Sequence, residues 1–395
     1  MSLFAKLPEP EIDAVLVLAQ AFRADVRTDK VDLGIGVYRD ENGNTPVMRA
    51  IAKATQDLAA NEATKAYIGL GGSDAFNTAI LNLLLGSTHD TARIHAVQTA
   101  AGAGALRLLT EVVKAAKPDA TMWISDPSWF NHAPIAESVG LAWTSYTYLD
   151  AETQSVNFAQ MCADLETASE SDIVLLHACC HNPTGANLTP AQWNEVTALI
   201  KRKRLIPMLD IAYLGFADGL EKDGYALRKM TSDLPEVMAA LSCSKTFGVY
   251  RDRVGAAIIV GETAAAANTA RESVMAAGRV NYSFPPNFTA EVITNVLTDV
   301  GLRAEFEAEL EHMRTRLIAN REGFADAARK HLGDERFDYV AAHQGMFSRL
   351  KLNPDTIQVL RDDHGIFMPS DGRINVAGLS PEISHRVAIA IKAVS

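Results

Sequence analysis

The sequence predicts an α/β protein with a large domain built on a mostly parallel β-sheet flanked by helices, and a smaller α/β domain. Two observations lead to this fold class. Short apolar segments alternate with longer segments of helical periodicity through most of the chain, which is the pattern of repeated βαβ units. From about Leu302 the alternation stops, and a long charged amphipathic helix leads into short strands and a final helix.

The individual elements follow from periodicity and from the turn-forming residues between them. A first amphipathic helix is expected over residues 12–27, after a loose arm that contains Pro8 and Pro10. Strands rich in β-branched and apolar residues are expected at 93–98, 121–125, 172–177, 205–209, 238–242 and 256–260. Further helices are expected at 106–116, 192–203, 302–331 and 382–393.

Composition and charge exclude several classes of function. A net charge of −11 argues against general binding to nucleic acid or to an anionic membrane surface. No apolar run approaches the roughly 18 residues of a membrane-spanning helix, and the first residues do not resemble a signal peptide. Four cysteines in 395 residues do not form a disulfide scaffold and fit a reducing compartment, so a cytoplasmic location is expected.

A lysine among small hydroxyl residues is the first candidate for chemistry. Lys245 stands in Ser-Cys-Ser-Lys-Thr-Phe-Gly after an apolar strand, where a solvated loop lysine is the commoner finding. A lysine amine also forms Schiff bases with aldehyde cofactors, whose pyridinium nitrogen needs a facing carboxylate. Asp210 ends an earlier apolar run and is expected at the carboxyl edge of the sheet, although a helix N-cap is the simpler role for it.

Two polar residues near these strand ends are candidates to bind a ring oxygen of such a cofactor. Tyr213 follows Asp210 by three residues, and Asn182 lies in the turn His-Asn-Pro-Thr-Gly. The alternatives are a packed tyrosine with a satisfied hydroxyl and a tight turn without function. A zinc site is a further alternative, but a regular strand would place its ligands on opposite faces; these would be His177, Cys179, Cys180 and His181.

Three further patterns complete the candidate site. Small residues at 99–107, between a strand and a helix, would let backbone N–H groups approach a phosphate, and Arg253 is suited to bind the same group. The run matches neither the dinucleotide nor the P-loop motif. Trp129 follows a proline at a strand end and is either a core residue or a stacking platform. Arg373 begins an apolar strand and is either an edge residue or a carboxylate-binding fork.

Together these motifs resemble class I aminotransferases of fold type I, which use pyridoxal 5′-phosphate (PLP), and most closely their aspartate and aromatic-amino-acid subgroup. The resemblance runs nearly end to end and keeps the family's order, which makes it specific although no single motif is decisive. It comprises LGIGVYRD at residues 33–40, KAYIGL, PSWFNH, HACCHNPTG, LDIAYLGFA, SCSKTFGVYRDRVGA, GRVNYSFPP, GMFS and GRINVAGLSPE.

The resemblance implies a role for each candidate residue. Lys245 would be the Schiff-base lysine and proton shuttle, with Asp210 on the pyridine nitrogen and Tyr213 beside it as the third catalytic residue. The remaining cofactor-binding residues would be Tyr67, Gly102, Ala103, Trp129, Asn182, Ser242, Ser244 and Arg253. The substrate-binding residues would be Gly36, Trp129, Asn182, Arg279, Arg373 and Phe347, with Arg373 on the α-carboxylate and Arg279 on a distal carboxylate.

The same resemblance implies an arrangement of domains and subunits. Residues 1–12 would form an arm that reaches a partner subunit, residues 46–311 the large PLP-binding domain, and residues 13–45 with 312–395 the small domain. The enzyme would be a homodimer with shared active sites, because Tyr67 and Arg279 would act in the neighbouring subunit. Amino-acid and 2-oxo-acid substrates would react in turn by a ping-pong mechanism.

The substrate range is expected to include aromatic and dicarboxylic amino acids, with 2-oxoglutarate as acceptor. Arg279 favours dicarboxylates, whereas Ala66, Ala103 and Phe284 make the surroundings smaller or more apolar, which favours an aromatic ring. An aspartate aminotransferase is the alternative, and Val37, Arg39 and Thr45 are of that type. A ligand-sensing module of a transcription regulator is a different class, but the chain has no basic DNA-binding segment and retains both Lys245 and Asp210.

Overall fold

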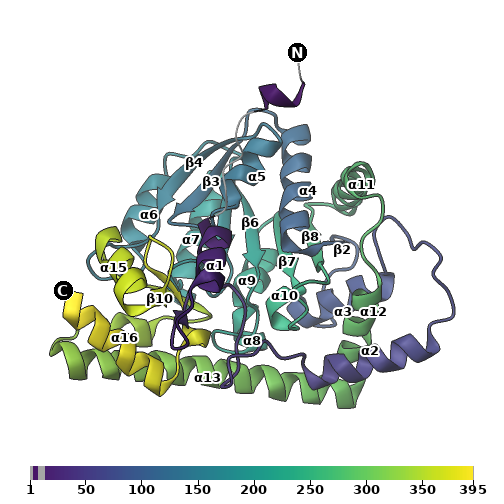
Figure 1. Ribbon diagram of the computed structural model, residues 1–395. Helices are drawn as coiled ribbons and strands as arrows, with labels where there is room; N and C mark the ends of the chain where they lie inside the picture. The colour runs from purple at the N-terminus through teal and green to yellow at the C-terminus, as the bar shows by residue number, and fades with distance from the viewer. Residues whose placement is uncertain (1–2, 8–13, 395) are drawn as a thin grey trace.

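A seven-stranded β-sheet lies between two layers of helices in the computed structural model, which describes residues 3–7 and 14–394 (Figure 1). All neighbouring strands are parallel except at β8, which is antiparallel to both of its neighbours, so the mostly parallel sheet is confirmed. In spatial order the strands are β2 (Ile94–Ala100), β8 (Val254–Val260), β7 (Val237–Ser242), β6 (Ile206–Ile211), β5 (Ile173–His177), β3 (Thr121–Asp126) and β4 (Ala142–Thr147).

The core has two parts because successive residues of a buried strand face opposite layers. In β8, for example, Ile258 packs into one cluster and Ile259 into the other. One face is covered by α4 (Ala101–Ala116), α5 (His132–Ser138) and α11 (Ala264–Asn281). The other is covered by α2 (Arg49–Asn61), α3 (Asp74–Leu85), α6 (Phe158–Leu165), α7 (Pro190–Lys203), α9 (Tyr225–Asp233), α12 (Phe288–Thr298) and α13.

The long helix α13 (Val300–Leu332) links the sheet to the C-terminal part of the chain and runs along one side of the molecule (Figure 1). The side chain of Asp299 caps its first turn, and Gly333 in a left-handed conformation ends it. Beyond it follow β9 (Phe347–Arg349), α15 (Pro354–His364), β10 (Ile366–Phe367), β11 (Arg373–Asn375) and α16 (Pro381–Val394). The remaining short elements are η1 (Phe4–Lys6), α8 (Leu220–Asp223), α10 (Cys243–Thr246), α14 (Tyr339–Ala342) and η2 (Val376–Gly378).

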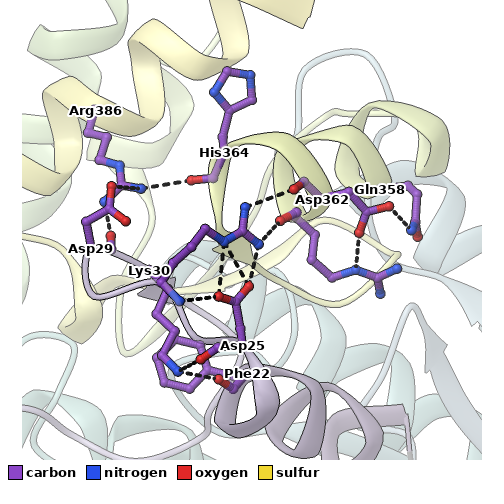
Figure 2. Close-up of polar contacts among 10 residues, drawn as sticks. Phe22, Asp25, Asp29, Lys30, Gln358, Asp362, His364 and Arg386 are labelled. Carbon is purple, nitrogen blue, oxygen red and sulfur yellow. Dashed lines mark hydrogen bonds and ion pairs between the residues drawn. The ribbon is translucent and has the colours of Figure 1, made fainter.

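The N-terminal segment packs against this C-terminal part. Strand β1 (Val31–Asp32) pairs in parallel with β10. Figure 2 shows a cationic cluster that fixes the segment after α1 (Ala14–Ala24): Lys30 donates to the carbonyls of Phe22 and Asp25, and Arg386 donates to that of His364. These cations bind carbonyl groups left free at helix ends, which stabilises the C-termini of α1 and α15. The two segments are joined by Arg27, which donates to the carbonyls of Arg361 and Asp362, and by the ion pair between Arg386 and Asp29.

Several element boundaries differ from the sequence prediction. Helix α4 begins at Ala101, so the small residues from 101 onward lie inside the helix and the expected loop at 99–107 is wrong. The chain turns from β2 into α4 at one residue, because Ala101 adopts a φ of 61°. The edge strand β4 was not predicted. The first helix ends at Ala24 rather than at Arg27, and the arm lies largely outside the described residues.

Candidate active site

The predicted cofactor residues converge on one pocket, with the exception of Tyr67. The pocket lies where β5, β6 and β7 end and α4 begins, which is the edge where parallel sheets of this kind bind ligands. It is lined by Gly102, Ala103, Leu106, Trp129, His177, Asn182, Asp210, Ala212, Tyr213, Ser242, Ser244, Lys245 and Arg253.

Lys245 projects into this pocket from the short helix α10. Its Nζ atom lies 4.9 Å from the centre of the Tyr213 ring. Burial lowers the pKa of the Lys245 amine to about 8; the Asp210 carboxylate opposes this shift, and the charges of Arg253 and Arg373 add to it. A substantial fraction of the amine is therefore neutral near physiological pH, which suits a nucleophile and proton carrier.

Asp210 is buried at the end of β6 and is held by a histidine that the sequence prediction did not select. The Nε2 atom of His132 lies 3.0 Å from Asp210 Oδ2, and its Nδ1 atom lies 2.9 Å from Ser128 Oγ. Burial raises the pKa of Asp210, but the hydrogen bond to His132 and the electrostatic attraction of neighbouring groups, Lys245 among them, outweigh burial, and the net pKa lies below the usual value. Asp210 is thus a carboxylate facing the pocket at neutral pH.

His177 also lines the pocket, next to Asp210. Its ring lies 5.1 Å from the ring of His132 and 4.3 Å from that of His181. Neither ring nitrogen has a hydrogen-bond partner among the described residues, and burial lowers the pKa of His177 to about 3. His177 is therefore neutral. The signal for both histidines was their place in the motifs PSWFNH and HACCHNPTG, where His177 ends β5 and His132 begins α5.

One end of the pocket is built to hold an anion. Gly102 lies in the first turn of α4, and a Cβ atom there would approach Ser242 Cβ to 2.9 Å, so only glycine permits this close approach. The N-terminus of α4 directs free N–H groups and a partial positive charge into the pocket. Ser244 and Arg253 lie alongside, with Arg253 Nη1 3.4 Å from Ser244 Oγ. A phosphate group matches these donors.

Two buried groups at the middle of the pocket retain bonding capacity. Asn182 Oδ1 has no hydrogen-bond partner within residues 3–7 and 14–394. The Tyr213 side chain is almost fully buried, and burial raises the pKa of its hydroxyl, which therefore stays protonated and able to donate. An unpaired buried amide oxygen costs free energy, so both groups are ready for a bound polar molecule.

Beside the pocket, residues from the two ends of the chain come together around Arg373 and Phe347. Arg373 Nη2 donates to the carbonyl of Gly34 at 3.0 Å, and its guanidinium lies 4.7 Å from the centre of the Phe347 ring. Phe347 in turn packs edge-on against Tyr213 at 5.8 Å. A Cβ atom at Gly36 would lie 3.7 Å from Phe347. The predicted substrate residues Gly36, Phe347 and Arg373 thus meet beside the pocket.

Tyr67 and Arg279 are the two predicted site residues that do not meet the others. Both are exposed, and neither lines this pocket in the described part of the chain. They lie next to each other instead. The Tyr67 ring stacks on Phe284 at 4.8 Å, and the Arg279 guanidinium lies 5.5 Å from the same ring and bonds to Ser283.

The residues of the zinc alternative separate into two groups. His177 lies with His132 and Asp210 beside the pocket, whereas Cys179 and Cys180 lie with Asp223. Cys180 has a φ of 52°, which interrupts the alternation of a regular strand and brings the two thiols to one side. The four predicted ligands therefore do not form one site.

The comparisons with known proteins cover almost the whole chain. The family model for aminotransferases of class I and II matches residues 28–391. The chain belongs to the class I and II aminotransferases. This aminotransferase is 44% identical over 379 residues to an aromatic-amino-acid aminotransferase of Paracoccus denitrificans, with 96% of each chain covered. It is 38% identical to an aspartate aminotransferase of Escherichia coli, over 99% of this chain and 100% of the other.

A solved structure agrees with the fold of this aminotransferase throughout. The aromatic-amino-acid aminotransferase of Burkholderia pseudomallei, covalently bound to pyridoxal phosphate, superposes with a TM-score of 0.97 at 37% identity and full coverage of both chains. No helix within the described residues is long and apolar enough to cross a bilayer.

Proposed function

We propose that this chain is an aromatic-amino-acid aminotransferase of dual specificity that transfers the amino group of aromatic and dicarboxylic L-amino acids to 2-oxoglutarate. The observation that carries the proposal is the pocket that joins Lys245, the carboxylate of Asp210 and an anion site at the start of α4. The relatives named for aromatic-amino-acid, tyrosine and aspartate transamination support the substrate class. The cofactor is pyridoxal 5′-phosphate.

The pocket fits this cofactor group by group. The phosphate matches Gly102, Ala103, Ser242, Ser244 and Arg253 at the start of α4. The unpaired Asn182 Oδ1 and the protonated Tyr213 hydroxyl face the middle of the pocket, Asp210 suits the pyridine nitrogen, and Trp129 offers a face for the ring. When bound, PLP supplies an aldehyde for the amino group and a ring that withdraws electrons from the substrate Cα.

The residues of the chain supply binding and proton transfer. The amine of Lys245, with its pKa lowered to about 8, removes the proton from the substrate Cα. The same amine would return that proton at C4′ of the cofactor. Asp210, held by His132, keeps a proton on the pyridine nitrogen because a nearby carboxylate favours the cationic form. Arg373 presents its guanidinium beside Phe347 and binds the substrate α-carboxylate.

The proposal includes a homodimer with shared active sites. Tyr67 is 86% exposed and stacks on Phe284 beside Arg279, although both predicted roles require contact with a bound cofactor or substrate. A second copy of the chain would receive this exposed unit in its own pocket, with Tyr67 toward the phosphate and Arg279 toward a distal carboxylate. The proposal also divides each chain into two domains. The large domain comprises residues 46–311, and the small domain comprises residues 13–45 with 312–395. It further includes a cytoplasmic location.

Dual specificity rests on the surroundings of Arg279. The guanidinium lies over the aromatic ring of Phe284, so an apolar surface accompanies the charge. Such a surface tolerates the ring of phenylalanine or tyrosine, whereas the guanidinium binds the second carboxylate of aspartate or glutamate. Aspartate transamination alone remains the second candidate, supported by the relatives named for that activity.

The first test is a comparison of two amino donors. Single-turnover conversion of the PLP enzyme by phenylalanine and by aspartate, followed by absorbance, is expected to give values of kcat/KM within about 100-fold of each other, because one pocket binds both. A preference for aspartate of about 10⁴-fold or more would leave the aspartate aminotransferase. No conversion with either donor, despite bound PLP, would overturn the proposed substrate class.

Two arginine variants separate the two carboxylate sites. Arg279→Leu is expected to lower kcat/KM for aspartate by about 10³-fold and that for phenylalanine by less than about fivefold, because only aspartate has a distal carboxylate. Arg373→Leu is the matched control and is expected to lower both values, because every substrate has an α-carboxylate. Equal losses for both donors with Arg279→Leu would contradict its assigned role.

Lys245 is expected to cost stability in protein prepared without cofactor. Its pKa falls from 10.5 to about 8 on folding, so the fold disfavours the protonated amine. The penalty reaches up to about 3 kcal/mol below pH 8 and disappears as the pH rises from about 8 to 10.5. Lys245→Met is therefore expected to be the more stable chain at neutral pH, by a margin that shrinks toward pH 10.5. Urea unfolding of both chains across this range measures the margin, and a margin independent of pH would contradict the lowered pKa.

A further inference from the structure

Gln98 is a fully buried amide on the outer edge of β2, and it binds two loops that are far apart in sequence. Its backbone N–H donates to the carbonyl of Gly71 at 2.9 Å, and its Oε1 accepts from the backbone N–H of Ser73 at 2.9 Å. Its Nε2 donates to the carbonyl of Pro286 at 2.6 Å. Both ends of the amide are therefore paired, each with a different loop.

The first loop is built around this side chain. Gly72 has a φ of 83°, and a Cβ atom there would lie 2.2 Å from Gln98 Cβ. The loop therefore lies against Gln98 as closely as the absence of a side chain permits. Ser73 then caps α3 by accepting from the N–H of Phe76. Tyr67 lies in a segment, residues 62–73, that contains no helix or strand. The bond from Gln98 to Ser73 fixes the end of this segment.

The second loop, residues 282–287, carries Phe284 and follows Arg279 at the end of α11. The two loops meet at their exposed ends, where Tyr67 stacks on Phe284 and Lys65 lies 4.9 Å from the Phe288 ring. These contacts are largely open to water and are worth little by themselves. The bonds of Gln98 tie the same loops together from a side chain that is itself fully buried, where an unpaired group is costly.

We propose that Gln98 is a positioning residue that fixes Tyr67 and Arg279 as one unit for the active site of the partner subunit. The inference rests on the proposed shared-site dimer. Gln98 is absent from the lining of its own chain's pocket, so its effect on catalysis would reach the reaction through the neighbouring chain. The amide is suited to this task because its carbonyl pairs with a donor and its NH₂ group with an acceptor.

Two substitutions of similar shape separate the two bonds. Gln98→Met removes both, and is expected to raise KM for 2-oxoglutarate and the dissociation constant of PLP by about tenfold each, with kcat changed less than about threefold. Gln98→Glu keeps an acceptor for Ser73 but faces the Pro286 carbonyl with an oxygen. It is expected to raise KM for 2-oxoglutarate while PLP retention, measured by absorbance after gel filtration, stays near that of the original chain.

Thr197→Val is the matched control for the loss of a buried hydrogen bond. The Thr197 hydroxyl is buried and bonds to the Trp193 carbonyl within α7, away from both loops. This variant is expected to lower the melting temperature with KM and PLP retention unchanged. If Gln98→Met likewise lowered only the melting temperature, its role would be structural and the inference would be overturned.

Hybrid dimers test whether Gln98 acts across the interface. One chain carries Lys245→Ala, so each hybrid has one working site, which receives Tyr67 and Arg279 from the Lys245→Ala chain. Gln98→Met on the Lys245→Ala chain is expected to raise KM for 2-oxoglutarate about tenfold. The same substitution on the other chain is expected to leave KM for 2-oxoglutarate unchanged. The reverse pattern would overturn the inference.

Arg279→Leu in the same two hybrids tests the shared site separately. If Arg279→Leu impairs aspartate turnover only when it is placed on the Lys245→Ala chain, the shared site is correct. The result for Gln98 then decides the inference by itself. If Arg279→Leu impairs aspartate turnover when it is placed on the chain that keeps Lys245, or if the protein is monomeric, the shared site is wrong. The inference about Gln98 is then overturned with it.

Discussion

Replacing Lys245 with alanine is expected to lower kcat/KM for every amino donor by about 10⁴-fold or more, the largest loss from any single substitution in this chain. The reason is that Lys245 supplies the amine in the pocket that carries the reacting proton, and burial has already lowered its pKa to about 8. Stopped-flow absorbance of the PLP-loaded variant with aspartate and with phenylalanine measures the loss.

Lys201→Ala is a suitable control for this prediction, because Lys201 lies exposed on α7 and outside the pocket. It is expected to leave kcat/KM unchanged. Added small primary amines are expected to restore part of the activity of Lys245→Ala, since they supply the missing base. A loss of less than about tenfold would show that another group transfers the proton.

Asp210→Asn is expected to lower kcat by about 10³-fold while the protein remains folded. Asparagine keeps the shape of the side chain and a bond to His132 but removes the negative charge. Without that charge the pyridine nitrogen loses its proton at neutral pH, and the ring withdraws fewer electrons from the substrate. Single-turnover rates and the absorbance of bound PLP report the two effects, and Asp210→Glu is expected to restore a large part of the rate.

Asp172→Asn provides the matched control for the loss of a buried aspartate. Asp172 precedes β5 at the opposite edge of the sheet and accepts hydrogen bonds from Thr121, Ser169 and Trp123. Its replacement is expected to lower stability without changing kcat. If Asp172→Asn lowered the rate as much as Asp210→Asn, both losses would come from a disturbed fold. That result would contradict the role of Asp210.

The strand-and-helix pattern and the centre of the site were accessible from the sequence, because both depend on local order. Apolar runs determine the strands, and a polar residue that ends such a run must appear at the carboxyl edge of a parallel sheet. Asp210 lies at the end of β6 and Lys245 follows the neighbouring strand β7, so the sheet brings them together. The start of α4 was mispredicted because Gly102 and Gly104 suggest a loop, whereas Ala101 alone makes the turn and both glycines lie inside the helix.

By itself the sequence thus determined the fold class, the family and the pocket residues that stand at strand ends. The tertiary structure decided which distant segments meet there: His132 under Asp210, and Arg373 bonded to Gly34, which is 339 residues away. The tertiary structure also leaves the side chains of Tyr67 and Arg279 exposed and places Gln98 between the two loops beside them. Such contacts depend on how the elements pack, and neither periodicity nor local turn chemistry carries information about partners so far apart in the chain.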